Sequence, residues 1–165
     1  MNNNDILRRV RYALDISNPG MIDIFKLSGC NLELPTLLKL LKKEEEEEFI
    51  SCSNPMLSFF LDGLIITRRG RREGDDGQQP KPDASLNNNA ILKKLRIALD
   101  LKEEDMLAVM KLAGVVISKS ELSALFRNKG HKHYKECGDQ FLRNFLQGLT
   151  VRFRGVAIAR AESAA

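Results

Sequence analysis

The chain has 165 residues, of which 43% are hydrophobic and 29% charged, and its formal net charge is +4. This apolar content is ordinary for a soluble globular protein. No apolar run approaches the roughly 18 to 20 residues that span a bilayer, which excludes a membrane partner through a spanning helix. The first residues, MNNND, lack the pattern of a secretory signal, and three cysteines without framework spacing suit a reducing compartment. We therefore predict a cytoplasmic protein.

The basic surplus is confined to one half of the chain. Residues 1–70 hold 9 basic and 10 acidic side chains, whereas residues 87–165 hold 14 and 8. Such an asymmetry is a weak indication of an anionic partner. It could equally complement the acidic run at residues 44–48 of the first half.

One stretch of the chain occurs twice. NNNDILRRVRYALD at residues 2–15 returns as NNNAILKKLRIALD at residues 87–100, an offset of 85 positions. The match continues at this offset to the closing FLDGL and FLQGL runs and the Arg-Gly pairs that follow them, with roughly a third of the paired positions identical. The chain is therefore a duplication.

These matches predict the domain organisation. We expect a first helical repeat at 1–70, a flexible linker rich in Gly, Pro, Asp and Gln at 71–86, a second helical repeat at 87–155 and a tail at 156–165. A copy of about 70 residues alone would have a marginal core. We therefore expect the two repeats to pack against each other within the chain.

The first helix of each copy has a clear apolar stripe at helical spacing. The stripe consists of Ile6, Val10, Ala13 and Leu14 in one copy and Ile91, Leu95, Ala98 and Leu99 in the other. Asn4 and Asn89 are placed to cap these helices. Residues four apart can also form ion pairs on them, namely Arg11 with Asp15 and Arg96 with Asp100.

Signals for three further helices follow in each copy. Asn18 and Pro19 predict the start of the second helix and Gly29 its end. Ser118 opens a capping-box pattern before a third helix, and its counterpart LPTLLKLLKK has a proline near the start. The fourth helix carries an apolar face of Leu57, Phe60, Leu61, Leu64 and Ile65. No stretch alternates with period two, so the sequence predicts an all-α fold of two tandem units with about four helices each, packed with pseudo-symmetry.

Glycine recurs inside both fourth helices, at Gly63 and Gly148. Glycine in a helix interior costs about 1 kcal/mol relative to alanine. Its presence in both copies favours a close helix crossing over the close approach of a ligand.

Taken together, the repeated NNN openings, the Met-x-x-Ile/Val-x-Lys-Leu-x-Gly helices and the Cys, FLxGL and Arg-Gly closings resemble the YehS-type proteins. The resemblance covers nearly the whole chain. It implies a small, cytoplasmic, bacterial protein with a duplicated domain and no assigned function, and it supplies no catalytic residues. The linker is longer than the resemblance leads us to expect, and the run of five glutamates is atypical.

The residues that could bind a metal are few. His131, His133 and Cys137 form an H-x-H-x3-C pattern, but neither a Cys-x2–4-Cys nor a His-x3–5-His half-site accompanies them. The favoured interpretation is a solvated loop followed by a small buried cysteine. Phosphate-binding glycine loops and a G-x-S-x-G motif are absent from the sequence. We therefore predict no cofactor and no enzymatic activity, and keep a small metal-binding protein or enzyme as the least favoured hypothesis.

Basic side chains on the first helices are the best remaining indication of function. Clusters repeated on two related units could straddle a phosphate backbone. The candidate nucleic-acid-binding residues are Arg8, Arg9, Arg11, Lys93, Lys94, Arg96, Arg69 and Arg154. Charge on the outer face of an amphipathic helix is nevertheless ordinary.

The first hypothesis is therefore a non-catalytic interaction module that binds a protein partner. The alternative is a nucleic-acid-associated regulatory protein.

Overall fold

The computed structural model describes residues 1–71 and 84–164, and the side chains of that part up to residue 155. Its regular elements are all helices, as predicted: α1 (Asn3–Ala13), α2 (Asn18–Leu27), α3 (Leu34–Leu40), α4 (Asn54–Arg69), α5 (Asn88–Ala98), α6 (Glu103–Leu112), α7 (Lys119–Leu125) and α8 (Asp139–Ala164). Residues 72–83 of the predicted linker lie outside the described residues. Leu86, at the end of that predicted segment, is buried in the core.

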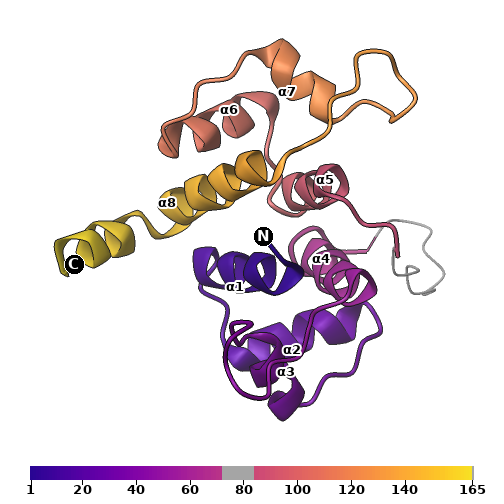
Figure 1. Cartoon of the computed structure of the whole chain (residues 1–165), viewed down its shortest axis with the longest axis vertical. Coiled ribbons are helices and arrows are strands. Elements are labelled where there is room, and N and C mark those ends of the chain that lie inside the picture. Colours follow the sequence, from indigo (N-terminus) through magenta and orange to yellow (C-terminus); the bar gives the residue numbers. More distant parts are fainter. Residues whose placement is uncertain (72–83, 165) are drawn as a thin grey trace.

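The first helix of each unit packs against the fourth helix of the other unit at the centre of the molecule (Figure 1). Helix α1 packs against α8 of the other unit, and α5 packs against α4, while α2 lies on α4 and α6 on α8. The remaining helices α3 and α7 lie with α2 and α6 at opposite ends. Because α1 corresponds to α5 and α4 to α8, the two seams between the units are related by pseudo-symmetry.

This arrangement buries more of the first helix than one stripe. The predicted positions Ile6, Val10 and Ala13 are buried, and so is Leu7, which has no exposed surface; Leu92 is its counterpart in α5. A helix that packs against only one neighbour needs one apolar face. Each first helix packs against both its own unit and the other one, so a second face is buried as well.

The two interior glycines lie where α4 crosses α2 and where α8 crosses α6. A Cβ atom on Gly63 would lie 1.9 Å from the carbonyl oxygen of Ile24, and one on Gly148 would lie 2.1 Å from that of Val109. Both crossings therefore require a residue without a side chain, which confirms the predicted close helix contact.

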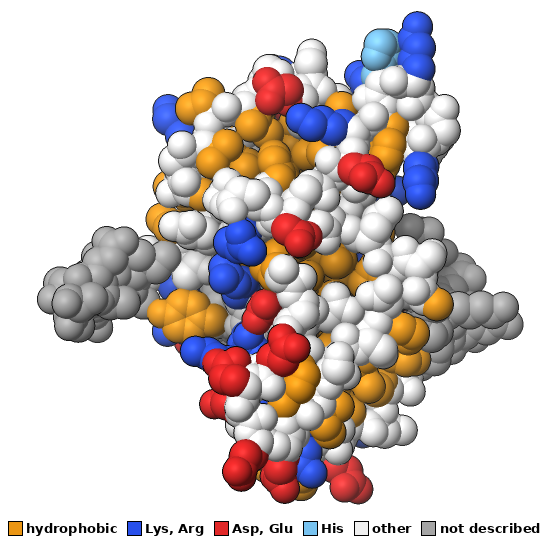
Figure 2. Space-filling view, in the orientation of Figure 1, with side chains coloured by type: hydrophobic (Ala, Val, Ile, Leu, Met, Phe, Trp, Pro, Cys, Tyr) orange, Lys and Arg blue, Asp and Glu red, His pale blue; other side chains and the backbone are white. Residues whose placement is uncertain are grey.

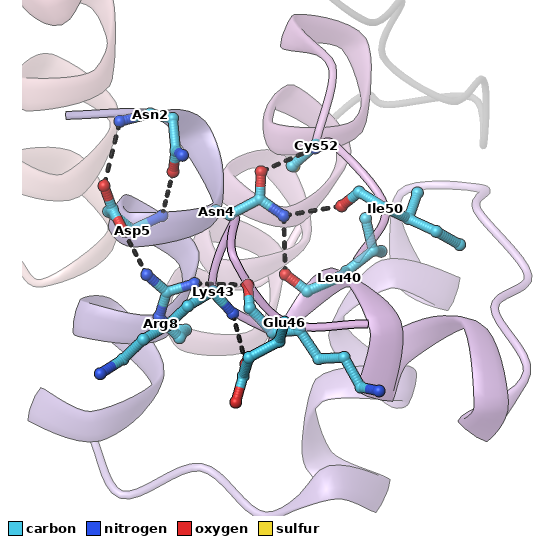
Figure 3. A network of polar contacts seen from close by, with 10 residues as sticks. Asn2, Asn4, Asp5, Arg8, Leu40, Lys43, Glu46, Ile50 and Cys52 are labelled. Atoms are coloured by element: carbon cyan, nitrogen blue, oxygen red, sulfur yellow. Dashed lines mark hydrogen bonds and ion pairs between the residues drawn. The ribbon is translucent and has the colours of Figure 1, made fainter. Parts of the chain in front are cut away.

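The first and third of the asparagines that open each repeat have different structural roles, and the predicted caps were wrong by two positions. Asn2 caps α1, because its side chain accepts the N–H of Asp5. Asn4 points instead into the protein (Figure 3). Its Nδ2 donates to the carbonyl oxygens of Leu40 and Ile50, both at 2.8 Å, and its Oδ1 accepts the N–H of Cys52 at 2.9 Å.

The second unit repeats these bonds. Asn87 is the cap of α5, and Asn89 donates to the carbonyl oxygens of Leu125 and Lys135 and accepts the N–H of Cys137. Each buried or half-buried asparagine thus fastens the long loop between the third and fourth helices to the first helix. The asparagine side chain thereby provides hydrogen-bond partners for backbone carbonyl and N–H groups that no helix pairs.

The predicted end of α2 is confirmed, whereas the start of α2 and the end of α8 differ from the prediction. Gly29 and Gly114 have φ values of 100° and 80°, which only glycine adopts without strain, and they end α2 and α6. Ser17 rather than Asn18 caps α2, because its Oγ accepts the N–H of Gly20. Helix α8 continues past the expected end to Ala164, with a non-helical residue at Arg154. None of the helices in the described ranges is long and apolar enough to cross a membrane.

Candidate functional site

On α1, two of the basic residues predicted to bind nucleic acid contact polar groups of their own unit. The Arg8 guanidinium pairs with the Asp5 carboxylate and donates to the carbonyl oxygen of Lys42 at 2.7 Å. Arg11 donates to the side-chain oxygen of Asn18 at 2.9 Å. Both side chains are half-buried, so neither presents a free charge to a phosphate backbone.

The equivalent helix α5 shows the same behaviour. Its Lys94 forms an ion pair with Asp62 of α4, with Nζ 2.5 Å from the carboxylate, and Asp62 is almost fully buried. Arg96 donates from Nε to the carbonyl oxygen of Leu101 at 3.0 Å and lies over the ring of Phe126, 4.7 Å from its centroid.

The last two candidates, Arg69 and Arg154, join the units to each other. Arg69 pairs with Asp100 and Arg154 with Asp15, each at 2.9 Å. The two contacts are equivalent under the 85-residue offset. The hydrogen bond from Lys102, together with the Arg69 charge, holds the pKa of Asp100 below its usual value.

These contacts also correct the ion pairs predicted within the first helices. The expected pairs of Arg11 with Asp15 and of Arg96 with Asp100 do not form. Each helix ends before its aspartate, which lies in the left-handed region at φ 52°. An aspartate in that conformation no longer shares a helix face with the residue four positions earlier.

Two of the eight candidates make no hydrogen bond or ion pair with any other residue that the structure describes. These are Arg9 on α1 and Lys93 on α5, and both are exposed. They are not equivalent positions, because Arg9 corresponds to Lys94 and Arg8 to Lys93. The structure therefore does not gather the eight residues into one surface. Among the described residues, it leaves only Arg9 and Lys93 of the eight without a hydrogen-bonding or charged partner.

A groove lies along the α1–α8 seam, beside Arg9. It has a volume of about 340 Å³ and is lined by Arg8, Arg9, Tyr12, Leu146, Gln147 and Thr150. The Arg154 guanidinium lies over the Tyr12 ring, 4.3 Å from its centroid, and fixes that wall of the groove. Sequence reasoning identified the arginines but missed Tyr12 and Gln147, because their contribution depends on a helix of the other unit.

The two ends of the molecule differ in chemistry. Around α3, the first unit exposes three large apolar side chains, Leu34 (45%), Leu38 (45%) and Ile50 (39%). The equivalent positions in the second unit hold Lys119, Ser123 and Lys135.

The loops beside these positions differ in charge as well. Exposed glutamates fill residues 44–48 of the first unit, whereas the equivalent loop of the second unit contains Lys129, His131, Lys132 and His133. Figure 2 shows this basic loop projecting from the upper end, while carboxylates gather on the lower half.

The possible metal ligands do not form a site. His131 and His133 are exposed, with ring centroids 5.6 Å apart, whereas Cys137 is buried. Burial, with a smaller effect of the nearby Asp139 charge, raises the pKa of Cys137 to about 11. No group of three or more His, Cys, Asp or Glu side chains in the part of the chain that the structure describes is arranged to hold a metal ion. The exposed loop and the buried cysteine agree with the solvent exposure that the sequence favoured for them.

Comparison with known proteins identifies the class to which this duplicated all-α fold belongs. The chain is a member of the DUF1456 family, described as a protein of unknown function, whose signature matches residues 3–70 and again residues 88–155. It is 43% identical over 152 residues to the uncharacterized protein YehS of Escherichia coli (strain K12), which covers 92% of this chain and 96% of the relative. No solved structure matches the chain significantly.

Proposed function

We propose that the protein is a non-catalytic binding module that docks a protein partner on the α3 surface of the first unit, defined by Leu34, Leu38 and Ile50. The observation that carries this proposal is the difference between equivalent surfaces of the two units. Exposed apolar clusters mark interaction sites when they are not scattered singly. Leu34 and Leu38 lie one helical turn apart, and the N–H of Ile50 bonds to the carbonyl of Lys39 at the end of α3.

Charge next to this surface indicates the chemistry of the partner. The acidic run at residues 44–48 begins after α3 and the short segment that contains Lys42 and Lys43, and it is exposed throughout. Complementary charge steers association and selects the partner. The expected partner is therefore an amphipathic helical segment with leucine-like anchors and lysine or arginine around them, laid along α3.

The second unit supplies substitutions for the test. The triple variant Leu34→Lys, Leu38→Ser, Ile50→Lys introduces residues that the equivalent positions already hold. A labelled Leu/Lys amphipathic helical peptide should bind the wild-type protein in fluorescence anisotropy, and at least about tenfold more weakly to the triple variant. A peptide with its lysines changed to glutamate should not bind.

A matched control changes exposed apolar residues elsewhere. Leu112→Ser with Val116→Ser alters two such positions of the second unit, which are 46% and 85% exposed. This variant should bind the peptide as the wild type does. Equal loss in both variants, or binding of the glutamate peptide, would contradict the proposal.

A nucleic-acid partner is the alternative. Its support now comes from the basic loop of the second unit and from Arg9 and Lys93, because the other six candidate residues are engaged inside the chain. An electrophoretic mobility shift with total nucleic acid should then weaken steeply with salt and disappear when Lys129 and Lys132 are changed to glutamate. A cytoplasmic location is also proposed, supported by three free cysteines.

A further inference from the structure

We infer that the α1–α8 seam contains a binding site for the carboxylate of a small organic acid, with Arg9 as its charged partner. This site is separate from the α3 surface and goes beyond the docking function proposed for it. The inference comes from comparing the two seams, which are equivalent by duplication but carry different charges.

The α4–α5 seam holds its carboxylate internally. Asp62 accepts Lys94 Nζ at 2.5 Å, and the Ser58 hydroxyl lies 3.5 Å from its other oxygen. Only 11% of the Asp62 side chain is exposed. Isoleucines occupy the flanking positions of this seam, Ile65 and Ile97. This seam is therefore closed by its own ion pair.

The α1–α8 seam has the cation without the carboxylate. Arg9 takes the position of Lys94, but Gln147 takes the position of Asp62. Both side chains are exposed and line the groove. Thr150 and Tyr12 replace the flanking isoleucines of the other seam. A ligand carboxylate placed here would supply the group that Asp62 supplies in the equivalent seam.

The charges around the groove favour a ligand with one negative charge. The positive charge of Arg8 is offset by Asp5 and that of Arg154 by Asp15, whereas Arg9 forms no ion pair with any residue that the structure describes. Glu44 and Glu45 line a neighbouring pocket on the other side of Arg9 and do not line this groove. A guanidinium binds a carboxylate through two parallel N–H···O bonds, and the Gln147 amide is a further donor beside it.

The rest of the groove suits a compact apolar body. The Tyr12 ring is 45% exposed and is held in place by Arg154. A volume of about 340 Å³ is at the lower end for small-molecule sites. The ligand class is therefore a small aromatic or aliphatic monocarboxylate.

Benzoate, with neutral benzamide as its control, tests the site by amide NMR titration of the full chain. Benzoate should give saturable shifts on α1 and α8 with a Kd of about 1–10 mM, and benzamide none. Arg9→Ala should weaken benzoate at least about tenfold. Gln147→Asp should abolish binding, because the new carboxylate would pair with Arg9 as Asp62 pairs with Lys94.

The matched control is Lys93→Ala, which removes an exposed first-helix cation from the other seam and should leave benzoate binding within about twofold of wild type. A short peptide with a free or amidated C-terminus distinguishes the carboxylate source. Tighter binding of the free form than of benzoate supports the site and identifies a protein terminus as its ligand. Equal shifts with benzoate and benzamide, or unchanged binding in both Arg9→Ala and Gln147→Asp, would overturn the inference.

Discussion

The α4–α5 and α1–α8 seams join equivalent pairs of helices, yet the first is closed by an ion pair and the second contains an open groove. Asp62 and Lys94 form a nearly buried ion pair in the first, whereas Gln147 and Arg9 remain exposed in the second. At the outer ends of both seams, by contrast, the Asp–Arg pairs have been kept in both copies.

This difference separates two kinds of position in a duplicated protein. Contacts that set the geometry of the units, such as the interior glycines and the bridging asparagines, occur in both copies. Positions on the solvent side of a seam can change in one copy without altering the fold. Divergence of this kind is therefore a better indication of function than the residues that the copies share.

The largest expected effect tests whether the interiors of the units are equivalent. Gly63→Ala and Gly148→Ala should each lower the free energy of unfolding by about 3 kcal/mol or more, because the new methyl group would overlap a backbone carbonyl of the crossing helix. Urea denaturation measures the loss. Gly130→Ala, which has no atom within 4 Å of the new Cβ, should be close to neutral.

The bridging asparagines Asn4 and Asn89 should contribute unequally to the free energy of unfolding, because Asn4 is more deeply buried than Asn89. Asn4→Ala leaves two carbonyls and one N–H without their partner in a buried site, at a cost of about 3 kcal/mol. Asn89→Ala should cost about 1–2 kcal/mol, since one of its bonds is exposed. Equal losses in the two variants would show that this difference in burial has no energetic consequence.

Giving each seam the residue of the other should change the free energy of unfolding by a smaller amount. The two substitutions should act in opposite directions. Asp62→Gln removes the partner of Lys94 and should destabilise the protein by about 1–2 kcal/mol, less than for a fully buried pair because Lys94 is partly exposed. Gln147→Asp should stabilise it by no more than about 1 kcal/mol. Thermal unfolding at neutral pH and low salt measures both, and high salt should reduce the gain of Gln147→Asp.

The smallest effect concerns the outer ion pairs and pH. Because the pKa of Asp100 is lowered in the folded state, its contribution to stability is present above the unfolded pKa and is lost as the pH falls through the folded pKa. Asp100→Asn, which keeps a residue tolerant of the left-handed conformation, should flatten the fall in melting temperature below about pH 4. If the melting temperature of this variant fell at low pH as steeply as that of the wild type, the Arg69 and Lys102 contacts would not contribute to stability.

The sequence predicted the helices, the duplication and the packing of the repeats, because these depend on periodicity and on local residue preferences. It placed the buried face of α4 almost correctly, and it placed the end of α2 at Gly29. It failed at the asparagine run, where Asn2 and Asn4 are both good caps by residue type. Only the position of the loop between α3 and α4 decides which asparagine caps α1 and which one bonds to that loop.

The basic clusters show the same limit. By composition, Arg8 and Lys94 are no different from Arg9 and Lys93. Their partners are Asp5 on the same helix and Asp62 on a distant one. The Arg8–Asp5 pair follows from spacing along α1, whereas the Lys94–Asp62 pair depends on a helix of the other unit, which the spacing along α5 does not contain.

What the sequence by itself determined is the architecture: two related helical units that bury their apolar faces together. What only the tertiary structure decided is which charges are neutralised and which seam stays open. Helix formation and apolar burial follow from patterns within one segment. Charge pairing across the seams depends on which residues of the other unit lie opposite, and that is set by the packing of the two units.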